Sequence, residues 1–406
     1  MSTVTQDAPA ATTIEITCNV LGLANALGKI KSVCPTRSPK PILQNVRLIV
    51  DPEKGSLLEA TDLEIGISVS VLGITAPRAV TLILPPIRLD QILQGAVGRA
   101  DTLVIAVTDS GSGPSAEIRL VAASGKKSTF HLPLESAENF PDVPRFPESG
   151  PYLQITSEDL KKLITRTIFA TDLEATRYAL GGCLFTVGKE ESGRDTVSLV
   201  ATDGRRLAKQ SVEAEFLDSW KPPTKEPVIP AKALKLVAKL AAPDVSTVAI
   251  TFDADKAILF KLDRATIYSR LVEGRFPKYQ DIFPTSCNGK ASCTVNELLW
   301  ATQQASIMTS EDSRGIDYRF ERLLGCTVNA SASEKGDGEI EATLDYAGPT
   351  ITITFCGAYL IEALQTLNRM DGVVLSLVDK NSPAVLTLAG ANGEYTYVVM
   401  PLTRDL

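Results

Sequence analysis

The sequence predicts an α+β protein in which three similar domains each pack two helices on antiparallel sheets. The first observation is a repeat: segments beginning at Ile14, Leu153 and Ala291 each place an alternating strand before a polar residue and an amphipathic helix. The second is that a strand runs straight into an amphipathic helix once in each unit, at 80–93, 227–240 and 352–367. The third is an alternating strand near the end of each unit, at 127–134, 265–272 and 394–402. All three features keep one order at nearly equal spacing, which makes chance similarity a poor explanation.

The individual elements follow from local patterns. Asn19, Ser157 and Asn296 lie near the starts of the first helix of each unit, where a side-chain oxygen can accept a free backbone N–H. Between the helices, stretches such as 55–71 alternate apolar and polar residues with period two, which predicts hairpins. Polar, glycine-rich stretches such as 188–195 predict loops.

Length and composition indicate a soluble chain of several domains. The 406 residues are 44% hydrophobic and 22% charged, and no apolar run approaches the ~20 residues that would span a bilayer. The N-terminal segment has neither the basic nor the apolar part of a secretory signal. We expect a disordered leader and three domains, at 1–13, 14–150, 151–284 and 285–406.

The charge is unevenly distributed along the chain. A formal net charge of −7 argues at first against nucleic-acid binding. Residues 151–284 however carry 20 basic and 18 acidic side chains, net +2, while residues 285–406 carry 8 and 15, net −7. Because the acidic excess lies in residues 285–406, basic helices elsewhere in the chain can still contact a polyanion.

Several kinds of chemistry are disfavoured by residue counts. The single histidine, His131, disfavours histidine-rich metal sites and Ser-His-Asp catalysis. The seven cysteines are odd in number, scattered and without a C-x-x-C motif, which predicts buried or half-buried thiols in a reducing cytoplasm. We therefore predict no catalytic residue, no metal site and no cofactor.

Two patterns resemble catalytic motifs only in part. The stretch 122–129, AASGKKST, lacks the first glycine of a phosphate-binding loop. Asp62 and Asp203 each follow Ala-Thr at equivalent repeat positions, and a carboxylate-based enzyme site there is one alternative. The stronger interpretation is that each aspartate closes a turn at a strand end with its side chain, because a catalytic group need not recur in both repeats.

Basic residues share helix faces. Lys232, Lys235 and Lys239 are spaced by three and four residues, and Lys162 and Arg166 by four. Each set alone is typical of a solvated helix, but its recurrence favours a surface that follows phosphates without reading sequence.

The last strand carries a second candidate surface. It ends in Met400, Pro401 and Leu402, which either belong to the core or line an apolar groove.

These features accompany six sequence motifs. They are KPILQNVRL (40–48), LEATDLEIGISV (58–69), TRYALGGCLF (176–185), LVATDGRRLA (199–208), EGRFPKYQDIFP (273–284) and YVVMPL (397–402). In this order the sequence resembles the bacterial β sliding clamps, the processivity subunits of DNA polymerase III, from about residue 14 to 404. The resemblance implies DNA-clamp domains that form a half ring, and a head-to-tail homodimer that encircles duplex DNA. It implies a non-catalytic cytoplasmic protein, associated with the nucleoid during replication, with no membrane partner. The implied partners are the replicative polymerase, a clamp loader, and other polymerases and repair proteins with clamp-binding peptides.

The resemblance also implies three sets of functional residues. Arg37, Tyr178 and Lys232 match positions that contact DNA, and Phe130 and Leu132 match dimer-interface positions opposite Ile307 and Met308. The matched positions of a partner-peptide pocket are Leu180, Thr202, Gly204, Arg205, Arg206, Leu207, Pro277, Ile282, Tyr359, Val398, Val399, Met400, Pro401 and Leu402. Apolar members would form the walls, while polar members such as Thr202 and Arg206 would orient the peptide.

The chain departs from the family pattern at the pocket. Arg205 stands where a histidine is usual, Gly181 where an asparagine is usual, and Asp281 near a position that is commonly basic. These departures bear on which peptides bind. Besides the enzyme, a repeat scaffold that binds only proteins is the other alternative.

Overall fold

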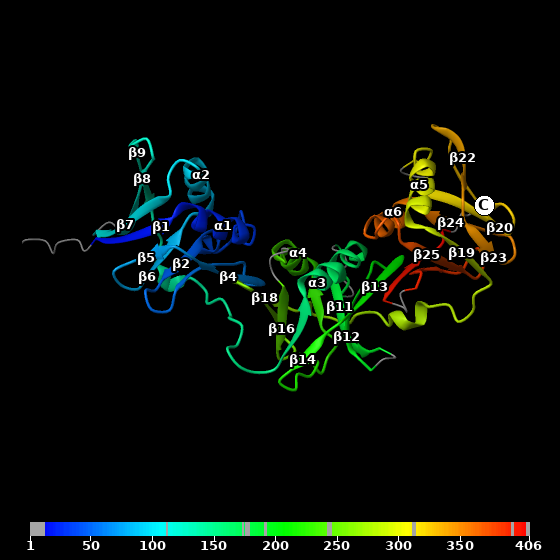
Figure 1. The fold of residues 1–406 in the computed structure, drawn as a ribbon, viewed down its shortest axis with the longest axis horizontal. Coiled ribbons are helices and arrows are strands. Elements are labelled where there is room, and N and C mark those ends of the chain that lie inside the picture. Colours follow the sequence, from blue (N-terminus) through cyan, green and yellow to red (C-terminus); the bar gives the residue numbers. More distant parts are fainter. Residues whose placement is uncertain are drawn as a thin grey trace, which may run out of the picture. The chain divides into compact units, whose positions relative to one another are not determined.

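The computed structural model describes residues 13–110, 113–172, 174, 179–190, 193–241, 246–310, 314–390 and 394–402. The chain divides into two compact units, each visible in Figure 1. Unit 1 comprises the chain up to Gly150 together with the hairpin 257–270, and unit 2 comprises 151–256 and 271–406. Over the described ranges, no helix combines the length and the apolar character that crossing a membrane requires.

Unit 1 contains two helices that pack against each other, α1 (Val20–Ile30) and α2 (Pro86–Ala96). One antiparallel sheet has the order β5 (Ile74–Thr75), β1 (Ile14–Asn19), β7 (Thr102–Ser110), β8 (Gly113–Val121), β9 (Lys127–Pro133). A second has the order β17 (Ala257–Leu262), β18 (Ala265–Arg270), β4 (Ile65–Val71), β3 (Ser56–Thr61), β2 (Val46–Val50), β6 (Val80–Leu84). The hairpin β17–β18 thus joins unit 1 through β4, with Ile267 opposite Ile67.

Unit 2 contains two pairs of packed helices. They are α3 (Ser157–Thr165) with α4 (Ala231–Leu240), and α5 (Val295–Ser306) with α6 (Gly357–Gln365). Its long sheet has the order β15 (Val228–Pro230), β11 (Gly182–Lys189), β12 (Asp195–Thr202), β13 (Arg206–Glu213), β27 (Tyr395–Val399), β26 (Ala384–Leu388), β25 (Gly372–Leu377), β19 (Gly289–Thr294), β23 (Asp345–Ala347). Two further sets of strands follow the orders β14 (Glu215–Leu217), β10 (Tyr152–Thr156), β16 (Thr247–Asp253) and β22 (Gly336–Ala342), β21 (Gly325–Ala332), β20 (Gly315–Glu321), β24 (Ile351–Cys356).

The predicted α+β class is confirmed, since every helix of the described chain is accompanied by antiparallel strands. The predicted strand-to-helix steps are present as β1–α1, β10–α3 and β19–α5, and again as β6–α2, β15–α4 and β24–α6. Asn19 caps α1 as predicted, by accepting the N–H of Gly22. The caps of α3 and α5 are instead Thr156 and Thr294, one and two residues before the predicted positions. Each threonine ends its strand and accepts an N–H three residues ahead, so Ser157 already lies inside the helix.

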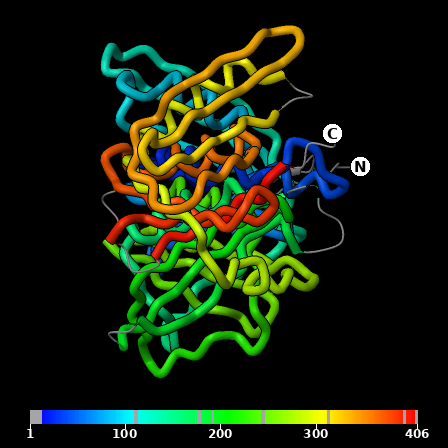
Figure 2. Tube along the Cα trace, turned by 90° about the vertical axis from the view of Figure 1, so that its right-hand side faces the viewer, coloured from blue at the N-terminus to red at the C-terminus, as the bar shows by residue number. Residues whose placement is uncertain are grey.

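Strands β13 and β27 join distant parts of the sequence into one sheet within unit 2. Leu207 lies opposite Val398, and Arg206 opposite Val399. Figure 2 shows the C-terminal strands, in red, running beside the green strands of the middle of the chain. The C-terminal segment is therefore placed beside the turn that precedes β13.

A buried ion cluster holds the segment after β9 in unit 1. Glu59 on β3 is 0% exposed and accepts Arg47 Nη2 at 2.7 Å and Arg145 Nη2 at 3.4 Å. The Arg47 guanidinium lies 5.0 Å from the ring centre of Phe140, which packs with Val143 and Ile83. Two arginines from different segments thus pair with one carboxylate, and that carboxylate has no access to water.

Candidate functional site

The two Ala-Thr-Asp segments form matching turns. Asp203 Oδ1 accepts two backbone N–H groups of its turn, at 2.9 and 3.0 Å, and Thr202 Oγ1 donates to the carbonyl of Arg206 at 2.6 Å. Asp62 and Thr61 make the same bonds before β4, at 3.0, 2.7 and 2.9 Å. The prediction that these aspartates close turns is confirmed.

The residue after each aspartate adopts a left-handed backbone conformation. Gly204 has φ +84° and Leu63 has φ +78°. Glycine takes this conformation without strain, whereas the Cβ of leucine comes too close to the following carbonyl oxygen. The second turn, next to β13, is therefore the less strained of the two.

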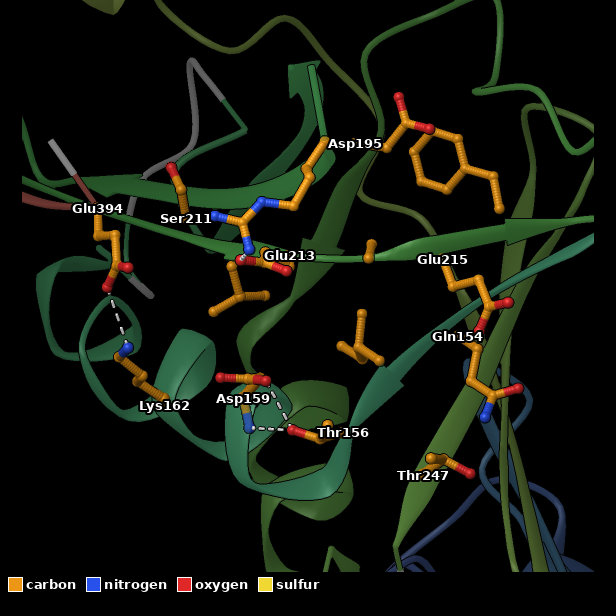
Figure 3. Close-up of a pocket in the computed structure, with 15 residues that line it drawn as sticks. Gln154, Thr156, Asp159, Lys162, Asp195, Ser211, Glu213, Glu215, Thr247 and Glu394 are labelled. Carbon is orange, nitrogen blue, oxygen red and sulfur yellow. Dashed lines mark hydrogen bonds and ion pairs between the residues drawn. The ribbon is translucent and has the colours of Figure 1, made fainter. Parts of the chain in front are cut away.

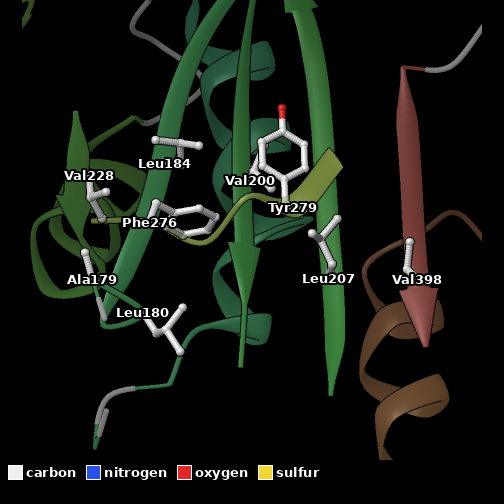
Figure 4. Close-up of a cluster of buried hydrophobic side chains, with 9 residues drawn as sticks. All are labelled: Ala179, Leu180, Leu184, Val200, Leu207, Val228, Phe276, Tyr279 and Val398. Carbon is white, nitrogen blue, oxygen red and sulfur yellow. The ribbon is translucent and has the colours of Figure 1, made fainter. Parts of the chain in front are cut away.

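Beside the second turn, predicted pocket residues meet in one apolar cluster. We call it the β13–β27 cluster, after the two strands that meet there. Its buried members are Ala179, Leu180, Leu184, Val200, Leu207, Val228, Phe276, Tyr279 and Val398, with Ile282 packed against them. Figure 4 shows these side chains on β11 and the segment before it, on β12, β13, β15 and β27, and on the segment that leads into η4 (Tyr279–Ile282). Phe276 and Tyr279 were not predicted as site residues, although both lie in the motif 273–284.

The cluster is packed, and its exposed part is a rim. Leu207 and Val398 are each 1% exposed, whereas Met400 is 39% exposed and Leu402 36%. The predicted residues Pro277 and Pro401 are half-buried at its border. Met400 and Leu402 therefore leave apolar surface exposed just after the end of β27.

Strand alternation separates two neighbouring predicted residues. Val398 belongs to the β13–β27 cluster, while Val399 is fully buried but is not part of it. Successive side chains of a strand point to opposite faces, so only one of the two valines can face the cluster. Val399 instead sets the register with Arg206.

Arg206 is buried, and its guanidinium donates hydrogen bonds to three protein groups. Its Nε donates to Asp203 Oδ2 at 2.9 Å, its Nη1 to Glu362 Oε2 at 2.7 Å, and its Nη2 to the carbonyl of Phe169 at 2.9 Å. The Tyr359 ring lies 4.4 Å below the guanidinium. Arg206 thus joins β13 to α6, and three of its five N–H donors are taken by protein groups.

Arg205 has opposite surroundings, although it is the preceding residue. Its side chain is exposed, and its carbonyl accepts the N–H of Met400 at 2.9 Å. The pKa of Arg205 is raised, first through a side-chain hydrogen bond with Tyr359. The backbone of Arg205 is therefore bonded to Met400, and its side chain lies near Tyr359 on α6.

The predicted basic residues divide into two groups. Lys232, Lys235 and Lys239 are exposed on α4, opposite the stripe of apolar residues that the helix buries. Lys162 instead pairs with Glu394 at 3.1 Å. Lys235 and Lys239 thus keep the exposure that a phosphate contact requires.

Arg166 is held in a similar way within unit 2. It donates to Gln210 Oε1 at 3.1 Å and lies 5.8 Å from the ring centre of Tyr395. Burial lowers its pKa. Arg37 is exposed in unit 1, and Tyr178 lies outside the described residues.

The predicted interface residues lie at two sheet edges. In unit 1, β9 ends its sheet, with Phe130 37% exposed and Leu132 5% exposed. In unit 2, β22 ends its sheet, Ile307 is 59% exposed, and Met308 packs close to Gly338 of β22. Both edges leave backbone groups without a strand partner inside their own unit.

A cavity that the sequence did not indicate lies beside α3 (Figure 3). It has a volume of about 640 Å³, and its lining includes Asp159, Asp195, Glu213 and Glu394. These carboxylates are held by Thr156, Lys189, Arg194 and Lys162, respectively. No set of three possible metal ligands gathers anywhere in the described part of the chain.

The cysteines are free, and most are buried. Burial raises the pKa of Cys18, Cys34, Cys183, Cys293 and Cys326 to about 12 in each case. Cys287 is exposed, against the expectation of burial, because it lies in the polar segment before β19.

Comparison with known proteins gives a consistent result. The model of the central domain of DNA polymerase III beta subunits matches residues 154–278, and that of their C-terminal domain matches 280–403. The chain is 30% identical over 386 residues to a beta sliding clamp of Pseudomonas putida, which covers 94% of this chain and 97% of that protein. It is 28% identical over 384 residues to that of Chlamydia pneumoniae, covering 94% and 96%. A crystal structure of a Pseudomonas aeruginosa sliding clamp bound to griselimycin is similar with a TM-score of 0.82 and 27% identity, covering 97% of this chain and all of that one.

Proposed function

We propose a function for this chain from one premise: it belongs to the family of bacterial DNA polymerase III beta subunits, the beta sliding clamps. It is a DNA polymerase processivity factor that acts in DNA replication. The observation that carries this conclusion is the match of both family models to consecutive segments of the chain. The finer points are our proposal: no catalytic activity of its own, no cofactor, and a place in the cytoplasm at the nucleoid.

The proposed assembly is a ring of two chains. Three domains over 14–150, 151–284 and 285–406 form a half ring, and head-to-tail contacts close it. The two family models support the second and third of these domains. In this assembly β9 of one chain adds to β22 of the other, so that Phe130 and Leu132 meet Ile307 and Met308 and both sheet edges are covered.

Charge supports the pairing of these two edges. The exposed side chains of β22 include Asp337, Glu339 and Glu341, whereas Lys126 and Lys127 lie at the start of β9. Opposite charges on the two edges would guide head-to-tail association and disfavour pairing of like edges.

Duplex DNA is proposed to pass through the ring without sequence-specific contacts. Lys232, Lys235 and Lys239 on α4 and Arg37 after α1 are the proposed cationic contacts, because they are exposed. Tyr178 remains a proposed contact from the family match. Lys162 and Arg166 are weaker candidates, since their charges already have partners within unit 2.

Partner proteins are proposed to bind the β13–β27 cluster through short peptides. The partners are the polymerase, the clamp loader, and other polymerases and repair proteins. Met400 and Leu402 form the proposed rim, and Leu180 and Leu207 form the floor. Tyr359 on α6 forms a wall. A peptide that orders on binding gains affinity from a few apolar anchors. The double variant Met400→Ala with Leu180→Ala should weaken peptide capture while leaving the ring folded.

The test of the proposed function is topological. The chain should have the solution mass of a dimer, should stay on nicked circular DNA after loading with a clamp loader and ATP, and should leave once the circle is cut. A variant with Ile307→Asp and Met308→Asp should be monomeric and fail to stay on the circle. Equal release from circular and linear DNA would contradict the ring.

A further inference from the structure

Two junctions inside the chain show how one repeat unit receives a strand from the next. In unit 1, β18 pairs with β4, and Ser269 lies opposite Ile65, the first residue of β4. In unit 2, β27 pairs with β13, and Val399 lies opposite Arg206, the first residue of β13. Each receiving strand begins after three residues that separate it from the preceding strand of its hairpin. The two junctions therefore share one register.

The same arrangement extends to β9 and β22, the two edges that meet in the proposed ring. β22 begins at Gly336, again after three residues that separate it from the preceding strand. The added strands β18 and β27 carry Thr266 and Thr396, each three residues before the residue that meets the start of the receiving strand. β9 carries its threonine at Thr129. Counting three residues onward places Leu132 opposite the partner's Gly336.

The packing of β22 agrees with this register. A Cβ atom at Gly338 would lie 3.1 Å from Met308 Cγ, so Met308 covers the face of β22 on which Gly338 lies. The register sets Phe130 opposite the partner's Gly338, where the missing side chain leaves room for an aromatic ring. On the other face it sets Lys127 opposite the partner's Glu341, a pair of opposite charges. Both faces of the joined sheet are therefore compatible with it.

His131 lies on the charged face of β9, where this register puts it between two carboxylates. Its side chain is 74% exposed in the single chain, and its Nδ1 is 4.0 Å from Glu117, its neighbour on β8. Arg119 also contacts Glu117, with its Nε 3.5 Å from that carboxylate. The register adds the partner's Asp337 directly opposite His131. Beside Asp337 on β21 lies Ser331, which carries no charge.

We infer that His131 is a dimer-interface residue that faces Asp337 of the partner subunit, and that the ring closes more tightly when the imidazole carries a proton. The inference rests on the proposed ring and adds to it a register and a pH dependence. A protonated imidazole donates from both ring nitrogens, so it can serve Glu117 with Nδ1 and the partner's Asp337 with Nε2.

The direction of the pH effect follows from the contacts that exist only in the dimer. Glu117 acts on His131 in the single chain and in the ring alike, whereas the partner's Asp337 is present only in the ring. The diagonal positions, the partner's Lys335 and the partner's Glu339, carry opposite charges. Association therefore takes up protons, and the affinity between the chains rises as the pH falls from 8 to 5.5.

The size of the effect is modest, because water and salt screen a pair at an exposed strand edge. One pair of this kind changes affinity about two- to threefold, so the two interfaces of the ring together change it about five- to tenfold. The chain has one histidine, and ordinary Asp and Glu side chains stay ionised over this pH range. The effect therefore reports on His131.

Sedimentation velocity of the full chain over a dilution series, at pH 5.5 and pH 8 in the same salt, measures the dissociation constant of the dimer. His131→Gln and Asp337→Asn should each abolish its dependence on pH. Asp345→Asn is the matched control and should keep the dependence, because it removes the same charge from an exposed residue of β23, in the other sheet. Equal affinity at both pH values in the parent, or a dependence that survives Asp337→Asn, would overturn the inference while the dimer itself stands.

Cysteine pairs test the register separately. Under oxidation, Thr129→Cys with Glu339→Cys should form a covalent dimer, since directly opposite residues satisfy disulfide geometry. Thr129→Cys with Glu341→Cys should not, since the second cysteine is displaced by two residues along the strand. Linking by the displaced pair, or by neither pair, would overturn the register. A chain that is monomeric at both pH values would instead contradict the proposed ring, and the inference would fail with it.

Discussion

Replacing Arg206 by methionine should destabilise unit 2 strongly, because one side chain supports three separate segments. The guanidinium binds Asp203 in the turn before β13, Glu362 on α6 and the carbonyl of Phe169. Methionine has a similar length but offers no donor and no charge. The variant therefore leaves polar groups of three segments without their partner.

The magnitude follows from the burial of those groups. The Asp203 side chain is 15% exposed, so its lost charge-assisted bond and the unpaired carbonyl of Phe169 each cost about 1.5–3 kcal/mol. Glu362 is 46% exposed, and its pair contributes little because water screens it. With the contact to Tyr359 and partial relaxation, we expect a total of about 4 kcal/mol.

Thermal unfolding followed by tryptophan fluorescence measures this effect in the correct unit. Both tryptophans, Trp220 and Trp300, belong to unit 2. For a body of this size about 4 kcal/mol corresponds to a Tm lower by about 10 °C.

Arg205→Met is the matched control, since it removes the same charge from the adjacent exposed position. It should melt within about 2 °C of the parent. A Tm for Arg206→Met within that range, or an equal loss in Arg205→Met, would refute the reasoning from burial.

Further predictions concern other parts of the chain. Glu59→Leu should destabilise unit 1 by about 3–5 kcal/mol, because Arg47 is left buried without its carboxylate; amide exchange of β2 and β3 measures this. Glu341→Lys should weaken the dimer in sedimentation equilibrium, and adding Lys127→Glu should restore it, whereas additive losses would argue against the proposed edge pairing. Replacing the three lysines of α4 by glutamine should reduce the slope of log DNA affinity against log salt concentration, by the amount expected for about three phosphate contacts per chain. An unchanged slope would exclude α4 from the DNA path. At pH 8 a thiol reagent should label Cys287 first, since it is exposed, whereas burial raises the pKa of five other thiols to about 12, those of Cys18, Cys34, Cys183, Cys293 and Cys326. Because their pKa values rise from 9.0 to about 12 on folding, unfolded thiols ionise first, so stability is complete below pH 9 and falls as the pH rises toward 12.

Local pattern predicted the order of elements well and their ends less well. The strand-to-helix repeats depend on alternation followed by helical spacing, which a few neighbouring residues determine. The caps of α3 and α5 were misplaced because threonine favours both strand ends and helix caps. At Thr156 and Thr294 it serves both purposes, so a search for the first polar residue after the strand places the cap one or two residues late.

Helical spacing could not distinguish a solvated face from one that packs on another strand. Lys162 and Arg166 are four residues apart, like Lys235 and Lys239, yet only the pair on α4 is exposed. The difference comes from Gln210 on β13, which accepts from Arg166, and from Glu394, the residue before β27, which pairs with Lys162. Glu394 is more than two hundred residues away in the sequence, so the pairing follows from the fold and not from the helix.

Adjacent residues at the site show the same limit most sharply. Arg205 and Arg206 are the same residue type in one motif, but β13 begins at Arg206. The side chain of Arg206 is therefore buried, whereas that of Arg205 is exposed. The inward arginine takes both carboxylates, whereas the outward one makes no ion pair with a carboxylate of the described residues. Losing Arg206 therefore leaves Asp203 and Glu362 without their cation, and losing Arg205 leaves neither of them so. Two neighbouring arginines of one motif should thus differ in their contribution to the Tm, because burial and pairing, and not residue type, set that contribution.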